Sequence, residues 1–405
     1  MQKKGTAECL KEQENETITS GSAGDTPVWV LHVVSRLAIS CGVMSVLMKL
    51  YRQMDRERVQ FAFLTHERSP MDYGDEIQAL GGRIHQLPKP AVGSLRLYRR
   101  QLRQVFVDHP EYRVVHGHVP VLLPFYMPEV LRQHVPRRIL HSHSSRHSAT
   151  RAKQLRNACL SRFYRYSHTD YFACSRESAR LLYGRRIPED RVLILRNAVN
   201  PDAYRMDSRT QQEIRRSLGL ENNWVMGHVG RFAREKNHLF LLQIFEEVLR
   251  RRPDARLLLV GAGEMDSEIR ETIGQRGLEG NVILSGPRRD VPALLQAMDC
   301  FVLPSLFEGL PLTVVEAQAA GVPCVVSDQV TDEVRITALV RTVSLSQSAG
   351  QWAEAILSWR PEADRLQIQQ DLRERGFDVR QTAKWLAEYY TGETEVSPDG
   401  CDSQE

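Results

Sequence analysis

Long apolar runs are missing from this chain of 405 residues. No stretch approaches the roughly 18 consecutive apolar residues that a membrane-spanning helix needs. The first 26 residues are polar and of mixed charge, and they lack the apolar segment of a secretory signal peptide. We therefore expect no membrane span, a disordered leader at residues 1–26 and a disordered tail at residues 392–405.

Cysteine pairs are lacking as well. The seven cysteines are scattered along the sequence, odd in number, and never spaced as C-x-x-C. This pattern is typical of a reduced protein in the cytoplasm, and it indicates neither a disulfide framework nor a structural zinc site.

Charge is present in ordinary amount but unevenly distributed. Hydrophobic residues make up 42% and charged residues 26% of the chain, as in soluble globular proteins. Residues 27–200 hold 28 Lys and Arg against 13 Asp and Glu, whereas residues 201–405 hold 23 against 32. A basic first half and an acidic second half indicate different partners for two domains.

Short apolar runs separated by helical patterns dominate both halves of the chain. The strands that we predict are 28–34, 60–65, 83–87, 112–118, 137–143, 171–175 and 192–197, then 224–230, 255–261, 281–286, 300–305 and 323–328. In the second half, helices are predicted to begin near Asn237, Glu264, Asp290 and Pro311. Continuous apolar strands alternating with helices predict parallel sheets covered on both faces.

The pattern restarts after a turn-rich stretch at residues 197–204. The predicted fold class is therefore α/β, with two Rossmann-like, doubly wound parallel-sheet domains that face a central cleft. Their predicted bounds are 27–200 and 201–378, followed by a terminal helix at 379–391. Ligands of such sheets bind outside the carboxyl ends of the strands.

HVGRFAREKNH (228–238) places two cations after a strand. Arg231 and Lys236 precede a helix for which Asn237 is the expected N-cap residue, and such a position suits a diphosphate. Two solvated cations on a loop are the alternative.

LLLVGAGE (257–264) resembles a dinucleotide fingerprint, but Asp266 occupies the position of its third glycine. A tight turn between strand and helix explains these glycines better. Further along, Gly286 ends a strand where its backbone can face a flat base.

SLFEGLPLTVVEA (305–317) carries two glutamates with seven residues between them. Glu308 precedes a helix, Gly309 permits close backbone approach, and the N–H groups of Leu310 and Leu312 are available to an anion or hydroxyl. Glu308 could simply complement the helix dipole. Glu316 lies among apolar neighbours and therefore needs partners; the vicinal hydroxyls of a ribose suit it.

The first half offers weaker signals. Gly42 lies in the loop after the first strand, where it allows a ligand to pass or serves as a turn glycine. Alternation places His141 and His143 on one face of a strand, with His143 at its carboxyl end. His143 is expected to line the cleft and His116 and His141 to be structural; a zinc pair is the alternative.

Two basic helical stretches, 94–106 and 144–168, interleave arginines with apolar and aromatic residues. They suit the headgroup region of an anionic membrane. A solvated helix face is the alternative, and neither stretch contains a nucleic-acid-binding motif.

The chain resembles the family-4 retaining glycosyltransferases of the GT-B fold. The resemblance rests on three motifs in this order: G-R-F-x-x-E-K-N, L-L-L-V-G-x-G and F-V-L-P-S-L-F-E-G-L-P-L-x-x-x-E-A. Within that family, the chain is similar to the subgroup of capsular and exopolysaccharide biosynthesis. The resemblance implies that Arg231 and Lys236 clamp the diphosphate of a nucleotide-sugar donor, while Glu316 holds the ribose. It implies that Glu308 and the backbone from Gly309 to Leu312 hold the sugar, which His143 touches across the cleft.

The family often has a Gly-Gly pair in the first loop, but here Cys41 precedes Gly42. The resemblance also implies no metal and no cofactor, consistent with the absence of an Asp-x-Asp motif, and no separate general base. We expect a hexosyltransferase that uses a donor, UDP-linked by analogy, to extend a lipid-linked glycan in the cytoplasm at the inner membrane face. A nucleotide-sugar epimerase and a non-catalytic nucleotide-sugar-binding protein are the alternatives; nucleic acid is not an expected partner.

Overall fold

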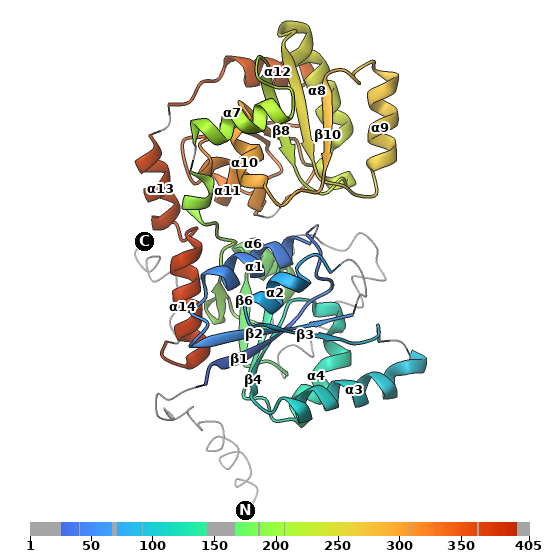
Figure 1. Ribbon diagram of the computed structural model, residues 1–405, viewed down its shortest axis with the longest axis vertical. Coiled ribbons are helices and arrows are strands. Elements are labelled where there is room, and N and C mark those ends of the chain that lie inside the picture. The colour runs from blue at the N-terminus through green and yellow to red at the C-terminus, as the bar shows by residue number, and fades with distance from the viewer. Residues whose placement is uncertain are drawn as a thin grey trace, which may run out of the picture.

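The computed structural model describes residues 26–39, 41–66, 71–90, 92–143, 167–184, 187–205, 207–308, 310–362 and 364–394. The predicted leader up to residue 25, the tail from residue 395 and most of the basic stretch 144–168 lie outside these residues. The chain folds into two units, each a parallel β-sheet with helices on both faces, stacked along the long axis in Figure 1.

The first unit contains a seven-stranded sheet in the order β3-β2-β1-β4-β5-β6-β7, in which every paired strand is parallel. Its strands are β1 (Val28–Val33), β2 (Val59–Thr65), β3 (Arg83–Gln86), β4 (Tyr112–Gly117), β5 (Arg137–Ser142), β6 (Asp170–Ala173) and β7 (Val192–Ile194). Its helices are α1 (Gly42–Gln53), α2 (Gly74–Ala79), α3 (Leu95–Asp108), α4 (Leu123–Arg132) and α6 (Arg176–Tyr183).

Successive residues of these strands pack into two different cores. Val30 and Phe61 lie in a core with α1 and α2, whereas the next residues, Leu31 and Ala62, lie in a core with α3, α4 and α6. Both faces of the sheet are therefore buried, which is why its strands are continuous apolar runs.

The second unit contains a six-stranded sheet in the order β10-β9-β8-β11-β12-β13, again parallel throughout. Its strands are β8 (Trp224–Val229), β9 (Ala255–Val260), β10 (Val282–Gly286), β11 (Cys300–Leu303), β12 (Cys324–Ser327) and β13 (Val340–Val343). Its helices are α7 (Ser208–Ser217), α8 (His238–Arg251), α9 (Asp266–Gln275), α10 (Val291–Gln296), α11 (Leu312–Ala319), α12 (Ala349–Ser358) and α13 (Arg365–Glu374).

The prediction of two doubly wound parallel sheets is confirmed, and all twelve predicted strands form. The four predicted helices of the second half begin one or two residues later than expected, at His238, Asp266, Val291 and Leu312. Strand β13 was not predicted, because this edge strand has only two buried residues, Val340 and Val343, at its ends.

The last helix, α14 (Val379–Thr391), returns to the first unit and packs against α1, β1 and β2. Figure 1 shows it in dark red beside the lower unit, below α13. Leu386, Ala387 and Tyr390 are at most 2% exposed and belong to the same core as α1. Where the chain crosses back, Val199 and Asp378 form an isolated parallel bridge. The first unit is thus completed by the end of the chain.

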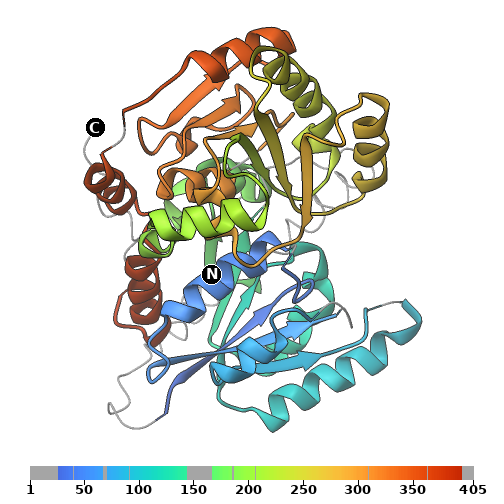
Figure 2. The ribbon, with the colours of Figure 1, turned by 45° about the horizontal axis from the view of Figure 1, so that its top comes forward.

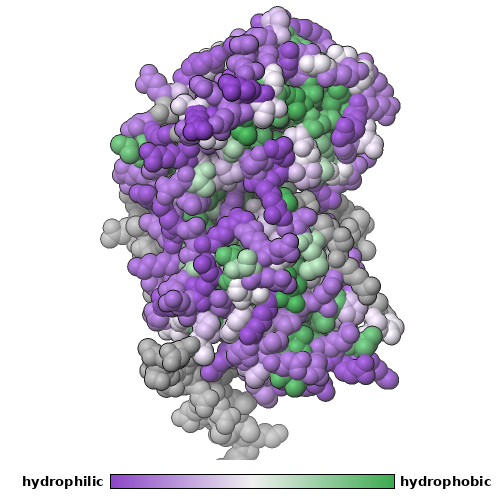
Figure 3. Space-filling model, in the orientation of Figure 1, coloured by the Kyte–Doolittle hydropathy of each residue, from purple (hydrophilic) through white to green (hydrophobic). Residues whose placement is uncertain are grey.

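The two units also touch through α1 and α11. Leu312, the first residue of α11, packs against the cores of both units. Figure 2 shows α1, in blue, on the side of its sheet that faces the second unit. The space-filling view in the orientation of Figure 1 is largely hydrophilic and is indented between the units at its right-hand edge (Figure 3). Among the described residues, no helix has both the length and the apolar character required to cross a membrane.

Because α14 completes the core of the first unit, Leu386→Ala should destabilise the protein by about 2–5 kcal/mol, the usual cost of a core leucine. Urea unfolding followed by circular dichroism measures this change. Lys384→Ala, on the exposed face of the same helix, is the matched control and should stay within about 0.5 kcal/mol of the parent protein. Equal stability of the two variants would contradict the packing described here.

Candidate functional site

Lys236 and Glu308 form an ion pair at the edge of the second sheet. Lys236 ends a short 3₁₀ turn (Arg234–Lys236) after β8, and its Nζ lies 2.5 Å from Oε1 of Glu308. The two side chains are only 15% and 14% exposed. The Ser305 hydroxyl donates to the same carboxylate oxygen at 2.9 Å. Two residues 72 positions apart are thereby held together as an ion pair at the cleft edge.

Backbone contacts hold the two loops of this pair together. The N–H of Leu306 donates to the carbonyl of Glu235 at 2.8 Å. Asn237 occupies the N-cap position of α8 as predicted, but in a left-handed conformation (φ 57°), and its side chain does not cap the helix. Its Nδ2 donates to the carbonyl of Pro304 at 3.1 Å instead. The expected capping role is wrong, because the amide joins two loops.

Arg231 lies apart from this pair. Its guanidinium contacts Glu264 at 2.8 Å, and the side chains are 55% and 50% exposed. An exposed pair of this kind contributes little stability, so an anion can replace Glu264 as the partner of Arg231 at a small cost in free energy. The sequence had indicated that α9 begins near Glu264. The helix begins at Asp266 instead, so Glu264 lies before its first turn.

The glycines of the G-A-G turn pack against the loop that carries Lys236. A Cβ at Gly261 would lie 1.9 Å from the carbonyl oxygen of Gly230, and one at Gly263 would lie 2.3 Å from that of Phe232. Gly261 also has a φ of +142°. Backbone crowding therefore accounts for both glycines, which agrees with the interpretation as a tight turn.

Glu316 is 6% exposed and lies one turn into α11. Its Oε1 accepts a hydrogen bond from the Tyr204 hydroxyl at 2.8 Å and forms an ion pair with Lys49 of α1. Burial and the nearby carboxylate raise the pKa of Tyr204 well above its ordinary value, so the phenol stays protonated and donates. The buried charge thus finds its partners in the first unit and in the segment between the units.

Lys49 is a site residue that the sequence interpretation missed. It is the only lysine in the apolar stretch VMSVLMKLY (43–51), and this isolated charge is the signal that could have identified it. Which acid it meets depends on how the two units dock, and that cannot be inferred from spacing along the chain.

The other predicted residues lie along the same facing edges. Gly42 begins α1, and an added Cβ would meet nothing within 4 Å there. Gly286 ends β10 with a φ of +68°. Leu310 is buried beside α11, and Leu312 begins that helix, where first-turn N–H groups lack intrahelical acceptors. Gly309 lies outside the described residues.

His143 follows β5, and its ring lies 3.9 Å from that of His141, which confirms that the two share a face. The buried His116 and His141 lie beneath, as expected of structural residues. Burial lowers the pKa of His143 to about 3 and that of His141 well below its ordinary value. His143 is therefore neutral near pH 7, and it can offer a hydrogen bond but not a charge.

Five histidines gather at this edge: His32, His116, His118, His141 and His143. Two sets of three have nitrogens within 4.8 Å of one another. The rings also contact one another: His116 stacks on His118 at 4.3 Å and 24°, and His143 is tilted against His141 at 3.9 Å and 30°. Four nitrogens of these sets pair with one another in hydrogen bonds, Nδ1 of His32 with Nε2 of His118 and Nδ1 of His118 with Nε2 of His143.

Two protein-family descriptions match most of the chain. The family "Glycosyl transferase 4-like domain" matches residues 42–198, and the family "Glycosyl transferases group 1" matches residues 210–374. The first match contains Gly42, Lys49 and His143, and the second contains Arg231, Lys236, Gly286, Glu308 and Glu316.

Individual proteins agree with these matches. EpsF of Bacillus subtilis (strain 168), whose name assigns it as a glycosyltransferase, is 32% identical over 375 residues, which are 90% of this chain and 97% of EpsF. A UDP-Gal:alpha-D-GlcNAc-diphosphoundecaprenol alpha-1,3-galactosyltransferase of Escherichia coli is 38% identical over 115 residues, 27% of this chain and 30% of that protein. The crystal structure of Anabaena Alr3699/HepE in complex with UDP-glucose superposes with a TM-score of 0.67 at 16% identity, covering 90% of this chain and 95% of that one.

Replacing Lys49 should be costly, because it leaves the buried carboxylate of Glu316 without its cation. We expect Lys49→Met to destabilise the protein by about 3–5 kcal/mol in urea unfolding. The matched control is Arg52→Met on the same helix, whose ion pair with Glu76 is 44% and 28% exposed and should be worth less than about 1 kcal/mol. A loss for Lys49→Met no greater than for Arg52→Met would show that Glu316 is not held by this lysine.

Proposed function

The chain belongs to the group 1 glycosyltransferases, and we propose that it transfers a sugar from a UDP-linked donor, with retention of anomeric configuration, to a growing lipid-linked glycan. The glycan is of the capsular or exopolysaccharide kind, and the enzyme acts at the cytoplasmic face of the membrane. The observation that carries the proposal is the Lys236–Glu308 pair, in which a cation suited to phosphate and a carboxylate suited to hydroxyls lie together at the facing edge of the second sheet.

Lys236 and Arg231 receive the diphosphate of the donor. Both follow β8 and precede α8, where a helix N-terminus and two cations favour an anion. Each is paired with a carboxylate, Lys236 with Glu308 and Arg231 with Glu264. The diphosphate exchanges these contacts for stronger ones, because phosphate oxygens accept charge-assisted hydrogen bonds.

Glu308 holds the hydroxyls of the transferred sugar. Its position is fixed by the Ser305 hydroxyl and by a backbone bridge to Val330, so the carboxylate is preorganised before the donor arrives. The N–H groups at the start of α11 and the neutral His143 of the first unit meet the sugar from other sides.

Glu316 holds the ribose hydroxyls, and the end of β10 at Gly286 lies beside the base. Glu316 is also engaged by Lys49 and Tyr204. Its second oxygen, Oε2, is not used in those contacts, so a ribose hydroxyl can donate to it without expelling the lysine.

Chemistry follows from charge neutralisation at the leaving diphosphate. Lys236 and Arg231 stabilise the negative charge that develops when the bond between the sugar and the phosphate breaks. The acceptor hydroxyl attacks from the same face, and the departing phosphate oxygen takes its proton. Neither a metal nor a separate general base is required on this route.

Two relatives support the finer parts of the proposal. The name of the Escherichia coli relative specifies a UDP-linked donor and an acceptor on diphosphoundecaprenol, and the superposed Anabaena protein was crystallised with UDP-glucose. The corresponding donor and acceptor classes are what we propose for this chain.

A basic face on α3 supports attachment to the membrane. Arg96 and Arg100 are exposed on this helix beside Leu97 and Val107, which are 43% and 60% exposed. Arginines flanking exposed apolar side chains suit the headgroup region of anionic lipid. The second basic stretch, 144–168, contributes only residues 167 and 168 to the described part of the chain.

Removing the diphosphate-binding cation should abolish most turnover. With a panel of nucleotide sugars and lipid-linked acceptors, we expect the parent protein to release UDP, and Lys236→Met to lower kcat/KM by about 10²–10³-fold. Arg270→Met, which removes an exposed arginine of the same unit paired with Asp266, should leave turnover unchanged.

Glu316→Gln should in addition weaken UDP binding by about tenfold in calorimetry, the worth of one hydrogen bond to a charged group.

Release of an epimerised nucleotide sugar without acceptor would identify an epimerase instead. Binding that raises the melting temperature without any hydrolysis or transfer would identify a non-catalytic binding protein.

The membrane contact is tested by co-sedimentation with liposomes that contain anionic phospholipid. Replacing Arg96 and Arg100 by serine should lower the partition coefficient by about thirtyfold, since each of the two surface cations contributes about 1 kcal/mol. A double variant of equal charge in the second unit, Arg250→Ser with Arg270→Ser, should bind like the parent. Equal binding by all three proteins would exclude α3 as the attachment face.

A further inference from the structure

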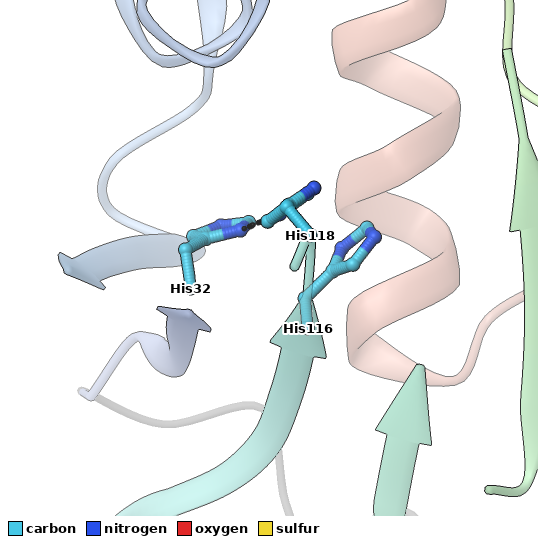
Figure 4. A group of neighbouring side chains, drawn as sticks. All are labelled: His32, His116 and His118. Atoms are coloured by element: carbon cyan, nitrogen blue, oxygen red, sulfur yellow. Dashed lines mark hydrogen bonds between the residues drawn. The ribbon is translucent and has the colours of Figure 1, made fainter. Parts of the chain in front are cut away.

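The five clustered histidines form two separate hydrogen-bonded chains. In the first, Nδ1 of His32 lies 2.9 Å from Nε2 of His118, and Nδ1 of His118 lies 2.8 Å from Nε2 of His143. In the second, the hydroxyl of Tyr390 lies 2.7 Å from Nδ1 of His116, whose Nε2 lies 3.2 Å from Nδ1 of His141. Figure 4 shows the ring of His32 meeting that of His118 edge to edge, while the nitrogens of His116 point elsewhere.

The first chain runs from the protein interior to the cleft. His32 lies on β1 and is fully buried, and His118, which follows β4, is 4% exposed. His143 follows β5 and is partly exposed. Burial lowers the pKa of His32 and of His143 to about 3, and that of His118 well below its ordinary value. All three imidazoles are therefore neutral near pH 7, and each carries one N–H and one lone pair.

Proton counting allows this chain only two arrangements, because both hydrogen bonds must run in the same direction. His118 uses both of its nitrogens, so it donates one hydrogen bond and accepts the other. If it donates to Nε2 of His143, the proton of His143 is on Nδ1, and His32 donates to His118. If the direction is reversed, Nε2 of His143 carries the proton and Nδ1 offers only a lone pair.

The inner end of the chain selects between these directions. Nε2 of His32 is buried and has no hydrogen-bond partner among the described residues. In the reversed chain this nitrogen would carry an N–H with no acceptor. Buried N–H groups without partners are rarer in proteins than buried acceptors without partners. The favoured direction therefore leads from His32 through His118 to His143.

We propose that His32 and His118 are positioning residues that fix the proton of His143 on Nδ1, so that the nitrogen left for the cleft is a hydrogen-bond donor. Its acceptor is an oxygen of the bound donor substrate, on the sugar or on the diphosphate. This inference rests on the proposed function, in which His143 faces that substrate. It adds which atom of His143 acts, in which protonation state, and which two residues determine that state.

The proton position is read directly by long-range 1H–15N NMR of protein labelled at histidine, with His143 assigned through His143→Gln. We expect the Nδ1–H tautomer in the unliganded parent protein. His118→Phe removes the donor and should shift His143 toward the Nε2–H tautomer that dominates in water. His118→Asn keeps an amide donor near the position of Nδ1 and should restore Nδ1–H.

Turnover supplies the second measurement. We expect His118→Phe to lower kcat/KM for the nucleotide sugar by about tenfold, and His118→Asn to recover most of it. An Nε2–H tautomer in the parent protein would overturn the proposal, even if His118→Phe failed to fold. So would unchanged kcat/KM in a folded His118→Phe, or stoichiometric zinc binding that is lost in His32→Leu.

Failure of the proposed function has a different signature. If no nucleotide sugar were bound or turned over, His143 would have no role in substrate binding. The NMR spectrum of the parent protein would still show the direction of the hydrogen bonds from His32 through His118 to His143.

Discussion

A single buried carboxylate, that of Glu316, ties the two halves of this protein together. It belongs to the second unit, but its cation, Lys49, belongs to the first, and its phenol, Tyr204, lies on the segment that joins them. A carboxylate removed from water requires such partners, because burying an unpaired charge is far more costly than burying a pair. Since α11 carries both Glu316 and the interdomain contact of Leu312, this one helix holds the second unit against the first by a buried ion pair and by apolar packing.

The facing edges assemble a site from loops that are remote in the sequence. Parallel sheets place all their strand-to-helix loops at one edge, so β8, β9 and β11 deliver Lys236, the G-A-G turn and Glu308 side by side. In the first unit the same rule gathers the histidines that follow or end β1, β4 and β5. A glycosyltransferase of this architecture therefore keeps rigid sheets behind its reacting groups, with the variable chemistry confined to loops.

Much of this arrangement could be predicted from sequence, because local physics determines it. Buried strands are apolar runs, and Glu316 stood out because its neighbours are apolar. The partners of these residues could not be predicted: the Glu316 pair with Lys49 depends on domain docking, and the bond from Asn237 to Pro304 competes with helix capping in a way that residue type does not reveal. Strand β13 was not predicted because two of its four residues are partly or fully exposed.

The return of α14 to the first unit has a consequence for how the protein is made. Tyr389 and Tyr390 lie in the same core as Val30 and Phe61, which are more than 300 residues earlier in the chain. A ribosome synthesises the whole second unit before it releases this helix. Until then, the apolar surface of the first unit that α14 covers stays exposed to water. Long-range contacts of this kind slow folding and expose aggregation-prone surface. The second unit, which is synthesised later, can therefore complete its core first.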